Sequence, residues 1–519
     1  MSKTDDYLLG MDCGTTNIKA VILSGSGKVV AEASRPSKFI SPGVDMHEQD
    51  ANEWWNSAVM IFKELSSKVG AGVIERIQGI CISSHTVSML PVDNDGNPLR
   101  NAMTYQDGRS SKELHYLLDK IGINRFVNIV GGQPSIAFLP SKILWYKNNE
   151  PDLFAKTKYF FQASSYINFK LTGVASSDID QATRTQCFDI NTMNCSDEIG
   201  EVIGINLGRM LPPLKSVDEI IGEVTKEAAE ATGLRVGIPV IAGCSDAMAS
   251  MHAIGMSRIG EAGESSGTTS LIFVGSETKS AVDIPVVTRP CSIPGMPWIF
   301  DAPIQTSGAA LRWFIDEFAH EERTYAKENG KDIYTYLNEL VLKSKPGSGG
   351  LFFFPYLLGE RAPLWNEYAK GMFIGMSMDM QRSDLVRSVL EGTSYALRHV
   401  METVKASGAK ADVLRICGGG AKSRTWCEIK ASMLKMPVYL LDEKSGDVPV
   451  GDAMIVGHKV GVFSDLEKAA EQIVKVKEII TPNDEWAESY DKLYPYYVKM
   501  YQNLDESLKE LHQTMNNLK

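Results

Sequence analysis

The chain has 519 residues, 44% of them hydrophobic and 23% charged, with a formal net charge of −11. This length predicts two or three domains with substantial cores. The acidic balance argues against an extended nucleic-acid surface, and no apolar run is long enough to span a bilayer. The N-terminal residues are polar, so we expect no signal peptide. The eight scattered cysteines indicate reduced thiols in a cytoplasmic protein rather than a zinc site.

An apolar segment over residues 7–23 is divided into two predicted strands by the turn Gly14-Thr15-Thr16-Asn17. A glycine turn brings backbone amides close to a ligand, and threonine hydroxyls add donors, so this turn is a candidate phosphate-binding loop. Asp12 ends the first strand, where a carboxylate is well placed to hold Mg²⁺ through water. An ordinary hairpin with a solvated aspartate is the alternative.

Apolar residues at helical spacing predict helices over 52–69 and 112–120, and short apolar runs predict strands over 78–83 and 236–243. Asp246 follows the last of these strands among small residues. A carboxylate at a strand's carboxyl end faces the open crevice of an α/β layer, where phosphoryl transfer to an alcohol needs a base. The alternative is that Asp246 caps the following helix.

The second half repeats the first motif, with Gly267-Thr268-Thr269 inside an apolar segment over residues 263–274. Two such hairpins suggest a duplication, with one hairpin opening each domain. Strands are predicted over 350–355 and 414–417, a helix over 382–405, and helical structure from 465 onward. The turn Gly418-Gly419-Gly420 is interpreted as a ligand-facing turn for a flat group such as adenosine, because three consecutive glycines serve no packing purpose. Neither a P-loop nor a protein-kinase loop is present.

The chain resembles the FGGY carbohydrate kinases from about residue 7 to 460. The most specific match is Gly371-x-Phe373-x-Gly375-Met376 followed by the segment 384–391, which is similar to the C-terminal signature of that family. The segment 138–145 is similar to the N-terminal signature only in part. Further similar stretches are found at 46–50, 106–109 and 355–363.

The resemblance implies an α/β fold of two actin/hexokinase-like (ribonuclease H-like) domains with a cleft between them. We expect an N-terminal sugar-binding and catalytic domain over 1–255, a nucleotide-binding domain over 256–464, and a helical extension over 465–519 packed on the second domain. It also implies ATP and Mg²⁺ as the nucleotide and the metal. By position it assigns Asp246 as the base, Asp12 to Mg²⁺, and Thr15, Thr16, Asn17, Gly267, Thr268, Gly419, Gly420 and Asp452 to ATP.

Four further residues are candidates for contact with the sugar. Ser84 and His85 stand where xylulose kinases carry a Met-His pair that touches the substrate, and Asp107 and Arg109 belong to a loop beside the same pocket. The alternatives are a structural histidine for His85 and a surface ion pair for Asp107 with Arg109.

The resemblance ranks a ketopentose such as D-xylulose first as the substrate. Xylulose kinases follow the catalytic aspartate with asparagine, whereas this chain has Ala247. Ribulose kinases carry a histidine where this chain has Met248-Ala249. Gluconate, ribulose, a deoxyketose, glycerol and a quorum-signal diketone stay open. A non-catalytic sugar or nucleotide sensor, a filament-forming ATPase and an ATP hydrolase are the rivals from other classes. A homodimer is plausible for such a kinase.

Overall fold

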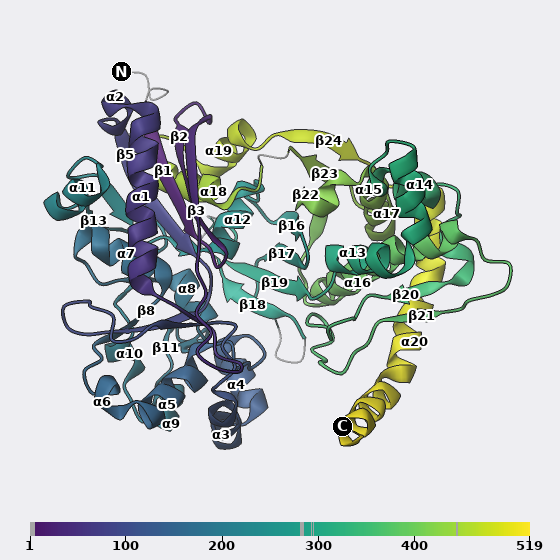
Figure 1. The fold of residues 1–519 in the computed structure, drawn as a ribbon, viewed down its shortest axis with the longest axis horizontal. Coiled ribbons are helices and arrows are strands. Elements are labelled where there is room, and N and C mark those ends of the chain that lie inside the picture. The colour runs from purple at the N-terminus through teal and green to yellow at the C-terminus, as the bar shows by residue number, and fades with distance from the viewer. Residues whose placement is uncertain (1–5, 281–284, 292, 294, 443–444, 519) are drawn as a thin grey trace. The chain divides into compact units, whose positions relative to one another are not determined.

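The computed structural model describes residues 6–280, 285–291, 293, 295–442 and 445–518. The chain divides into two compact units, each drawn in Figure 1 with its own sheet and helices. Unit 1 consists of residues 1–257, 289–297 and 446–474, and unit 2 of residues 258–288, 298–445 and 475–519. Each unit is described by itself.

Unit 1 alternates strands and helices through the first half of the chain and gains two helices from the second half. Its strands are β1 (Tyr7–Cys13), β2 (Asn17–Ser24), β3 (Val29–Pro36), β4 (Glu48–Gln49), β5 (Ile77–Ser84), β6 (Ser88–Val92), β7 (Ala102–Thr104), β8 (Tyr159–Phe161), β9 (Ser177–Asp178), β10 (Phe188–Asp189), β11 (Asn194–Cys195), β12 (Leu214–Lys215), β13 (Ile220–Glu223), β14 (Pro239–Ile241) and β15 (Cys244–Ser245). Its helices are α1 (Ala51–Val69), α2 (Ala71–Ile74), α3 (Ser111–Ile121), α4 (Ile123–Val130), α5 (Leu139–Asn149), α6 (Pro151–Phe154), α7 (Ala163–Thr172), α8 (Ile179–Arg184), α9 (Asp197–Ile203), α10 (Leu207–Met210), α11 (Lys226–Thr232), α12 (Asp246–Ala253), α18 (Val448–Lys459) and α19 (Leu466–Ile473).

Unit 2 has fewer strands and longer helices. Its strands are β16 (Gly260–Ser266), β17 (Ser270–Ser276), β19 (Trp298–Ile304), β20 (Phe352–Phe354), β21 (Met372–Ile374), β22 (Ala411–Gly418), β23 (Val438–Leu441) and β24 (Val476–Ile480). Its helices are α13 (Gly308–Phe318), α14 (His320–Glu328), α15 (Ile333–Val341), α16 (Arg382–Ala406), α17 (Arg424–Leu434) and α20 (Asp484–Asn517). The strand β18 (Val287–Pro290) lies where the chain passes between the units.

The main sheets of the two units share one topology. In unit 1 the strands β1, β2 and β3 are antiparallel neighbours, and β5 lies parallel to both β1 and β14. In unit 2 the strands β16, β17 and β19 are antiparallel neighbours, and β22 lies parallel to both β16 and β23. Each Gly-Thr-Thr motif forms the first turn of its sheet. The structure therefore confirms two α/β domains that each open with the repeated hairpin.

Local sequence explains why the predicted elements form. In α1, the Asp50 side chain caps the helix by accepting from Asn52 N, and buried Trp54, Phe62 and Leu65 recur at helical spacing on the face that packs into the core. Burying each such side chain stabilises the fold by about 1.5–3 kcal/mol. The predicted helix over 382–405 is α16, which is buried along most of its length.

The segment 446–474 differs from the predicted domain order, because the structure places it in unit 1 rather than in the second domain. Two glycines explain how its helix α18 packs there. A Cβ on Gly10 of β1 would lie 1.9 Å from the Pro449 carbonyl oxygen, and one on Gly451 would lie 1.9 Å from the Ala249 carbonyl oxygen. The backbones of β1, α12 and α18 thus approach more closely than any other residue would permit.

The C-terminal segment also contains a strand where only helix was predicted. Residues Val476–Ile480 form β24, which extends the unit 2 sheet by pairing antiparallel with β23. The helix α20 follows, and its Tyr490, Tyr497 and Tyr501 enter the core of unit 2 beside α16 and β20. The strand has only five residues, and its sequence shows no apolar-polar alternation that would distinguish it from the helices on either side.

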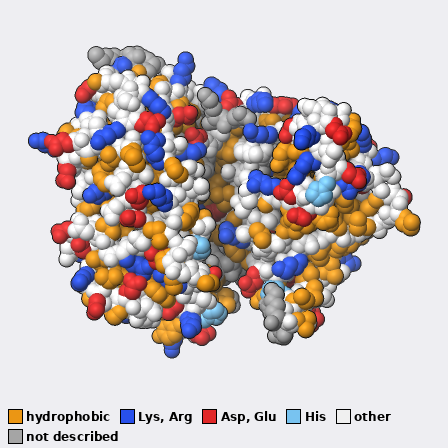
Figure 2. All heavy atoms as spheres, viewed as in Figure 1, with side chains coloured by type: hydrophobic (Ala, Val, Ile, Leu, Met, Phe, Trp, Pro, Cys, Tyr) orange, Lys and Arg blue, Asp and Glu red, His pale blue; other side chains and the backbone are white. Residues whose placement is uncertain are grey.

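Charges of both signs are interspersed on the face drawn in Figure 2, and no single basic stripe runs across it. None of the helices in the described part of the chain combines the length and the apolar character that crossing a bilayer requires.

Candidate active site

Three parallel strands of unit 1 end side by side, and their ends carry the residues predicted for catalysis. The strand β5 lies parallel to β1 and to β15, with Ser84 beside Ser245. Asp12 in β1, His85 after β5 and Asp246 after β15 therefore share one edge of the sheet. Carboxyl ends of parallel strands are where α/β sheets bind ligands.

Asp246 is the first residue of α12, and the residue before it is the N-cap. Ser245 Oγ accepts a hydrogen bond from Met248 N at 3.1 Å. Asp246 Oδ1 accepts from Ala247 N at 2.7 Å, and its side chain stays partly exposed. The interpretation of Asp246 as the cap is therefore wrong. Its carboxylate lies at a helix N-terminus, which stabilises negative charge.

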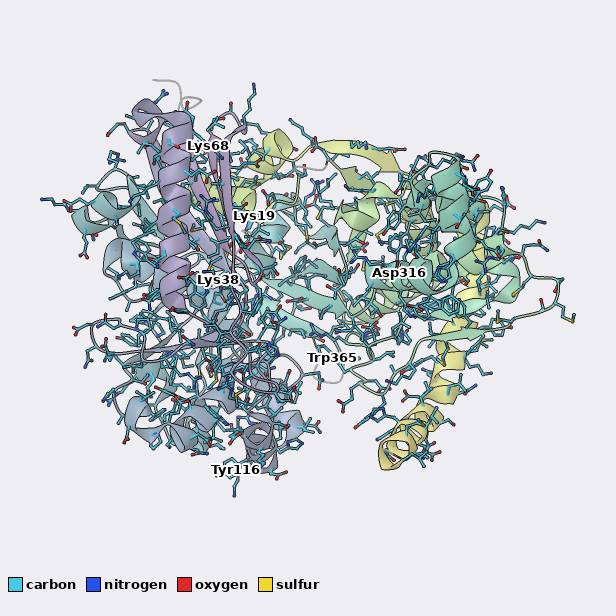
Figure 3. The ribbon with its side chains drawn as sticks, in the orientation of Figure 1. Lys19, Lys38, Lys68, Tyr116, Asp316 and Trp365 are labelled. Carbon is cyan, nitrogen blue, oxygen red and sulfur yellow. The ribbon has the colours of Figure 1, made fainter. Side chains whose placement is uncertain are left out.

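Asp12 carries a buried oxygen, Oδ1, for which no hydrogen-bond partner lies among the described residues. Burial raises the pKa of Asp12 well above its ordinary value, and the charges of Asp246 and Asp447 raise it further, whereas Lys19 lowers it. Lys19 extends from β2 with its Nζ 3.6 Å from Asp447 Oδ1 (Figure 3). An unpartnered carboxylate oxygen close to a second carboxylate fits Mg²⁺, which prefers oxygen ligands.

The carbonyl groups of the first Gly-Thr-Thr turn all accept hydrogen bonds. Gly14 O accepts from Ser37 Oγ at 3.1 Å, Thr15 O from Gln49 Nε2 at 3.0 Å and Thr16 O from Ser37 N at 2.8 Å. Among the described residues, no acceptor is present for the N–H groups of Thr15 and Thr16. With its carbonyls occupied and its amides unused, the turn suits an anion.

The second Gly-Thr-Thr turn is arranged in the same way by a different partner. Gly267 O accepts from Gly308 N at 3.0 Å, and Thr268 O accepts from Ser307 N at 3.1 Å. A Cβ on Gly308 would lie 2.4 Å from Gly267 O, so the start of α13 must be glycine to support the turn. The turn itself is exposed. Gly267 N donates to Thr269 O at 2.9 Å within the turn, so that Thr268 and Thr269 are the residues whose amides have no acceptor among the described residues.

The three consecutive glycines do serve a packing purpose, contrary to the prediction. A Cβ on Gly418 would lie 2.5 Å from Ser266 O, and one on Gly420 would lie 2.1 Å from Ser266 Oγ. Only Gly419 is both exposed and clear of close contacts, with its nearest neighbour atom at 3.8 Å. Glycine at two of these positions therefore reflects the close pairing of β22 with β16.

A buried ion pair lies beneath the second turn. Lys430 Nζ of α17 lies 2.6 Å from Glu264 Oε1 of β16, and both side chains are only 2% exposed. The Ser270 hydroxyl lies 2.8 Å from both Glu264 Oε1 and Ser307 Oγ. Ser270 Oγ is placed to donate to either acceptor, and its single proton serves one of them at a time. This chain of bonds links the ion pair to the residue that holds Thr268.

His85 is a fully hydrogen-bonded, buried residue. Its Nδ1 lies 2.9 Å from Cys13 O, and its Nε2 lies 2.9 Å from Ser88 Oγ. Because a carbonyl only accepts, Nδ1 carries the proton and Nε2 accepts from the serine. Burial lowers the pKa of His85 to about 4, against the backbone hydrogen bond to Cys13, which raises it. This geometry favours the structural interpretation, and contact with the substrate stays a prediction.

The low pKa of His85 predicts acid sensitivity of folding. The neutral form is favoured in the folded state, so the unfolded chain binds a proton first as pH falls below about 6.5. The titration of His85 therefore lowers the free energy of unfolding by about 3 kcal/mol between pH 6.5 and pH 4. Above pH 6.5 it has no effect. We expect urea unfolding of wild type and His85→Asn to differ by a constant above pH 6.5 and by a changing amount below it. A difference that is independent of pH throughout would contradict this.

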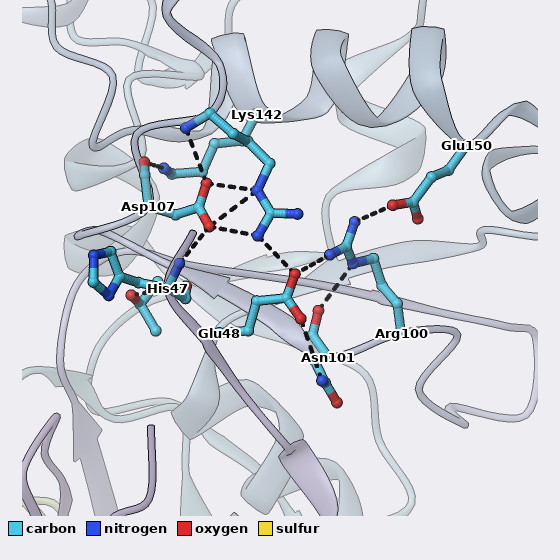
Figure 4. Close-up of polar contacts among 9 residues, drawn as sticks. His47, Glu48, Arg100, Asn101, Asp107, Lys142 and Glu150 are labelled. Carbon is cyan, nitrogen blue, oxygen red and sulfur yellow. Dashed lines mark hydrogen bonds and ion pairs between the residues drawn. The ribbon is translucent and has the colours of Figure 1, made fainter. Parts of the chain in front are cut away.

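Asp107 lies in a buried network of ion pairs, which Figure 4 draws with Glu48 and Arg100. Arg109 belongs to the same network. Arg109 Nη2 lies 2.7 Å from both Asp107 Oδ2 and Glu48 Oε1, and Glu48 also pairs with Arg100. His47 N donates to Asp107 Oδ2 at 2.8 Å. Asp107 and Arg109 therefore form the ion pair that was the alternative to contact with the sugar, although the pair is buried rather than at the surface. The network ties the loop after β7 to β4.

Asp452 lies in unit 1, whereas Gly419 and Gly420, which were assigned with it to ATP, belong to unit 2. The Asp452 side chain is fully buried, and its Oδ2 accepts from Ser83 Oγ at 2.7 Å. Its Oδ1 lies 3.5 Å from Cys81 Sγ. These contacts join α18 to β5 and favour a structural role.

Comparisons with known proteins identify the family of the chain. The N-terminal domain model of the FGGY family of carbohydrate kinases matches residues 7–253, and its C-terminal domain model matches residues 264–459. The chain belongs to the FGGY family of carbohydrate kinases. It is an ATP-dependent sugar kinase with the two-domain α/β fold of that family, as the sequence predicts.

Several relatives of this FGGY kinase are similar to it along their whole length. A xylulose kinase of Staphylococcus epidermidis is 28% identical over 98% of both chains, and a gluconokinase of Bacillus subtilis is 26% identical over 97% of both. The crystal structure of a xylulose kinase from Rhodospirillum rubrum matches with a TM-score of 0.88 at 28% identity, covering 97% of this chain and 100% of that one.

Sequence reasoning missed the buried polar residues that contact the strand ends and the turns of the candidate site. Asp180 and Gln181 of α8 contact the ends of β5 and β15, and Glu264 with Lys430 lies beneath the second turn. A consecutive Asp-Gln pair gives no signal of its own. Glu264 could have been found, because a charged residue inside an apolar strand of a central sheet needs a partner.

Proposed function

We propose that the chain phosphorylates a ketopentose such as D-xylulose, with Asp246 as the general base. The observation that carries the assignment of the base is the position of Asp246 at the end of β15, where Ser245 has taken over the capping of α12. The xylulose kinases among the similar proteins support the choice of sugar.

In the proposed reaction, Asp246 accepts the proton of the attacking sugar hydroxyl. The hydroxyl oxygen bonds to the γ-phosphorus of ATP, the bond to the bridging oxygen breaks, and ADP leaves. The amides of Thr15 and Thr16 in the first turn, and of Thr268 and Thr269 in the second, bind phosphate oxygens, because no acceptor for them is present among the described residues. Gly419 provides an open backbone position for the adenine.

Asp12 is the proposed residue for Mg²⁺, held through water. The ion supplies charge neutralisation to the phosphates when it is bound. Asp12→Asn should raise the Mg²⁺ concentration needed for the half-maximal rate by about 10–100-fold, since residues beyond direct coordination affect metal affinity to this extent. Calorimetric titration of Mg²⁺ into the ADP complex provides a second readout. The control is Asp218→Asn, which removes a carboxylate that pairs with Lys459 at an exposed site. An unchanged Mg²⁺ dependence would refute the assignment.

A coupled assay of ADP release tests the substrate. The panel contains D-xylulose, D-ribulose, gluconate, glycerol and a deoxyketose, and each sugar is ranked by kcat/KM. We expect D-xylulose to rank first and Asp246→Asn to lower its kcat by about 10²–10⁴-fold. ATP consumption that does not depend on any added sugar would instead indicate a hydrolase.

Gluconate is the second candidate substrate. A gluconokinase is similar along the whole chain, and Ala247 departs from the asparagine that follows the base in xylulose kinases. A higher kcat/KM for gluconate in the same panel would favour this candidate. A homodimer and a cytoplasmic location stay predictions.

A further inference from the structure

One buried turn of α8 holds the segments that carry Asp246 and His85. Gln181 and Asp180 are 0% and 2% exposed, and the helix is capped by Asp178, whose Oδ1 accepts from Gln181 N at 2.7 Å. Neither side chain belongs to the reaction proposed above, yet each contacts a residue directly next to a site residue. Polar side chains that are this deeply buried need hydrogen-bond partners, and here several of the partners belong to the strand ends that carry the site.

Asp180 contacts the residue that precedes the proposed base. Its Oδ2 accepts from Ser245 N at 2.9 Å and from Ser245 Oγ at 2.5 Å. Its Oδ1 lies 3.1 Å from Arg184 Nε, which holds the carboxylate from the other side. Because Ser245 Oγ also accepts from Met248 N, one serine joins Asp180 to the first turn of α12. The backbone that carries Asp246 is thus fixed by a charge-assisted bond.

Gln181 contacts both neighbouring strand ends with one amide. Its Nε2 lies 2.9 Å from Ser84 Oγ and 3.3 Å from Cys244 O, which belong to β5 and β15. Its Oε1 accepts from Thr86 Oγ1 at 2.9 Å. The residues on either side of His85 and the residue two before Asp246 are therefore held by a single side chain.

We propose that Asp180 and Gln181 are positioning residues that set the orientation of the Asp246 carboxylate against the sugar hydroxyl. This inference rests on the proposed function of Asp246. A displaced base slows the reaction even when it can still accept a proton, and a displacement of about 1 Å can lower the rate about 100-fold. Loss of either contact should lower kcat and leave the KM for ATP unchanged.

Asp180→Asn and Gln181→Met test the proposal, each made alone and in the Asp246→Asn background. We expect each single variant to lower kcat by about 10–100-fold. In the Asp246→Asn background the same changes should have almost no effect on the residual rate, since the base to be positioned is gone. Damage that is merely structural would lower the rate equally in both backgrounds and would overturn the proposal. The matched control is Asp197→Asn at the start of α9, which removes a carboxylate in the same unit that makes none of these contacts and should keep wild-type kcat.

A further variant covers the case in which Asp180→Asn does not fold. Ser245→Ala removes only the hydroxyl between Asp180 and α12, and it should lower kcat in wild type but not in Asp246→Asn. A wild-type rate for both Ser245→Ala and Gln181→Met would also overturn the proposal. Failure of the proposed function is recognised separately, because Asp246→Asn alone would then keep its rate.

Discussion

Asp246→Asn should lower kcat by about 10²–10⁴-fold, the usual contribution of a positioned general base. Asparagine has nearly the same shape and can still accept the hydrogen bond from Ala247 N, so α12 should remain intact. It cannot take a proton from the sugar hydroxyl at neutral pH. The affinity for ATP should be unchanged, because the phosphate-binding turns are not altered. Steady-state assays of ADP release, together with nucleotide titration, measure both quantities.

A second Ser-Asp pair in unit 1 gives the matched control. Ser196 caps α9 by accepting from Ile199 N at 3.2 Å, and Asp197 is the first residue of that helix, as Asp246 is of α12. Asp197→Asn removes the same charge in the same local setting, away from the strand ends. It should leave kcat at the wild-type value. If Asp246→Asn kept most of its turnover, another residue would have to be the base.

Lys430→Met should lower the free energy of unfolding by about 3–5 kcal/mol. The change leaves Glu264 charged and buried without its cation, while methionine fills much of the space of the lysine stem. Ser270 would then be the remaining donor to this carboxylate. Urea denaturation followed by circular dichroism gives the loss. Nucleotide affinity should fall as well, because Ser270 and Ser307 connect the ion pair to the turn at Thr268.

Two variants separate charge burial from loss of packing. Adding Glu264→Gln to Lys430→Met should recover much of the stability, since no unpaired charge is then buried. Lys492→Met breaks an exposed pair with Glu488 in α20 and should cost only about 0–1 kcal/mol. A Lys430→Met protein as stable as the Lys492→Met protein would show that the buried pair does not hold unit 2 together.

The sequence motifs do not specify which residue pairs with Glu264 or with Ser245. Glu264 and Lys430 are separated by 166 residues and meet only because β16 pairs with β22 and α17 packs beside them. Likewise, Asp180 approaches Ser245 across 65 residues. Long-range polar contacts depend on the register and packing of whole elements, which local patterns do not specify.

The sequence by itself determined the repeated hairpin, the α/β class, the family and the position of Asp246 after an apolar strand. These follow from local signals: apolar period, glycine turns and motifs of contiguous residues. The tertiary structure decided what His85, Asp107 and Asp452 do, because burial and partners exist only in the folded chain. It also placed α18 in unit 1, since the close approach at Gly10 and Gly451 is a property of packed backbones.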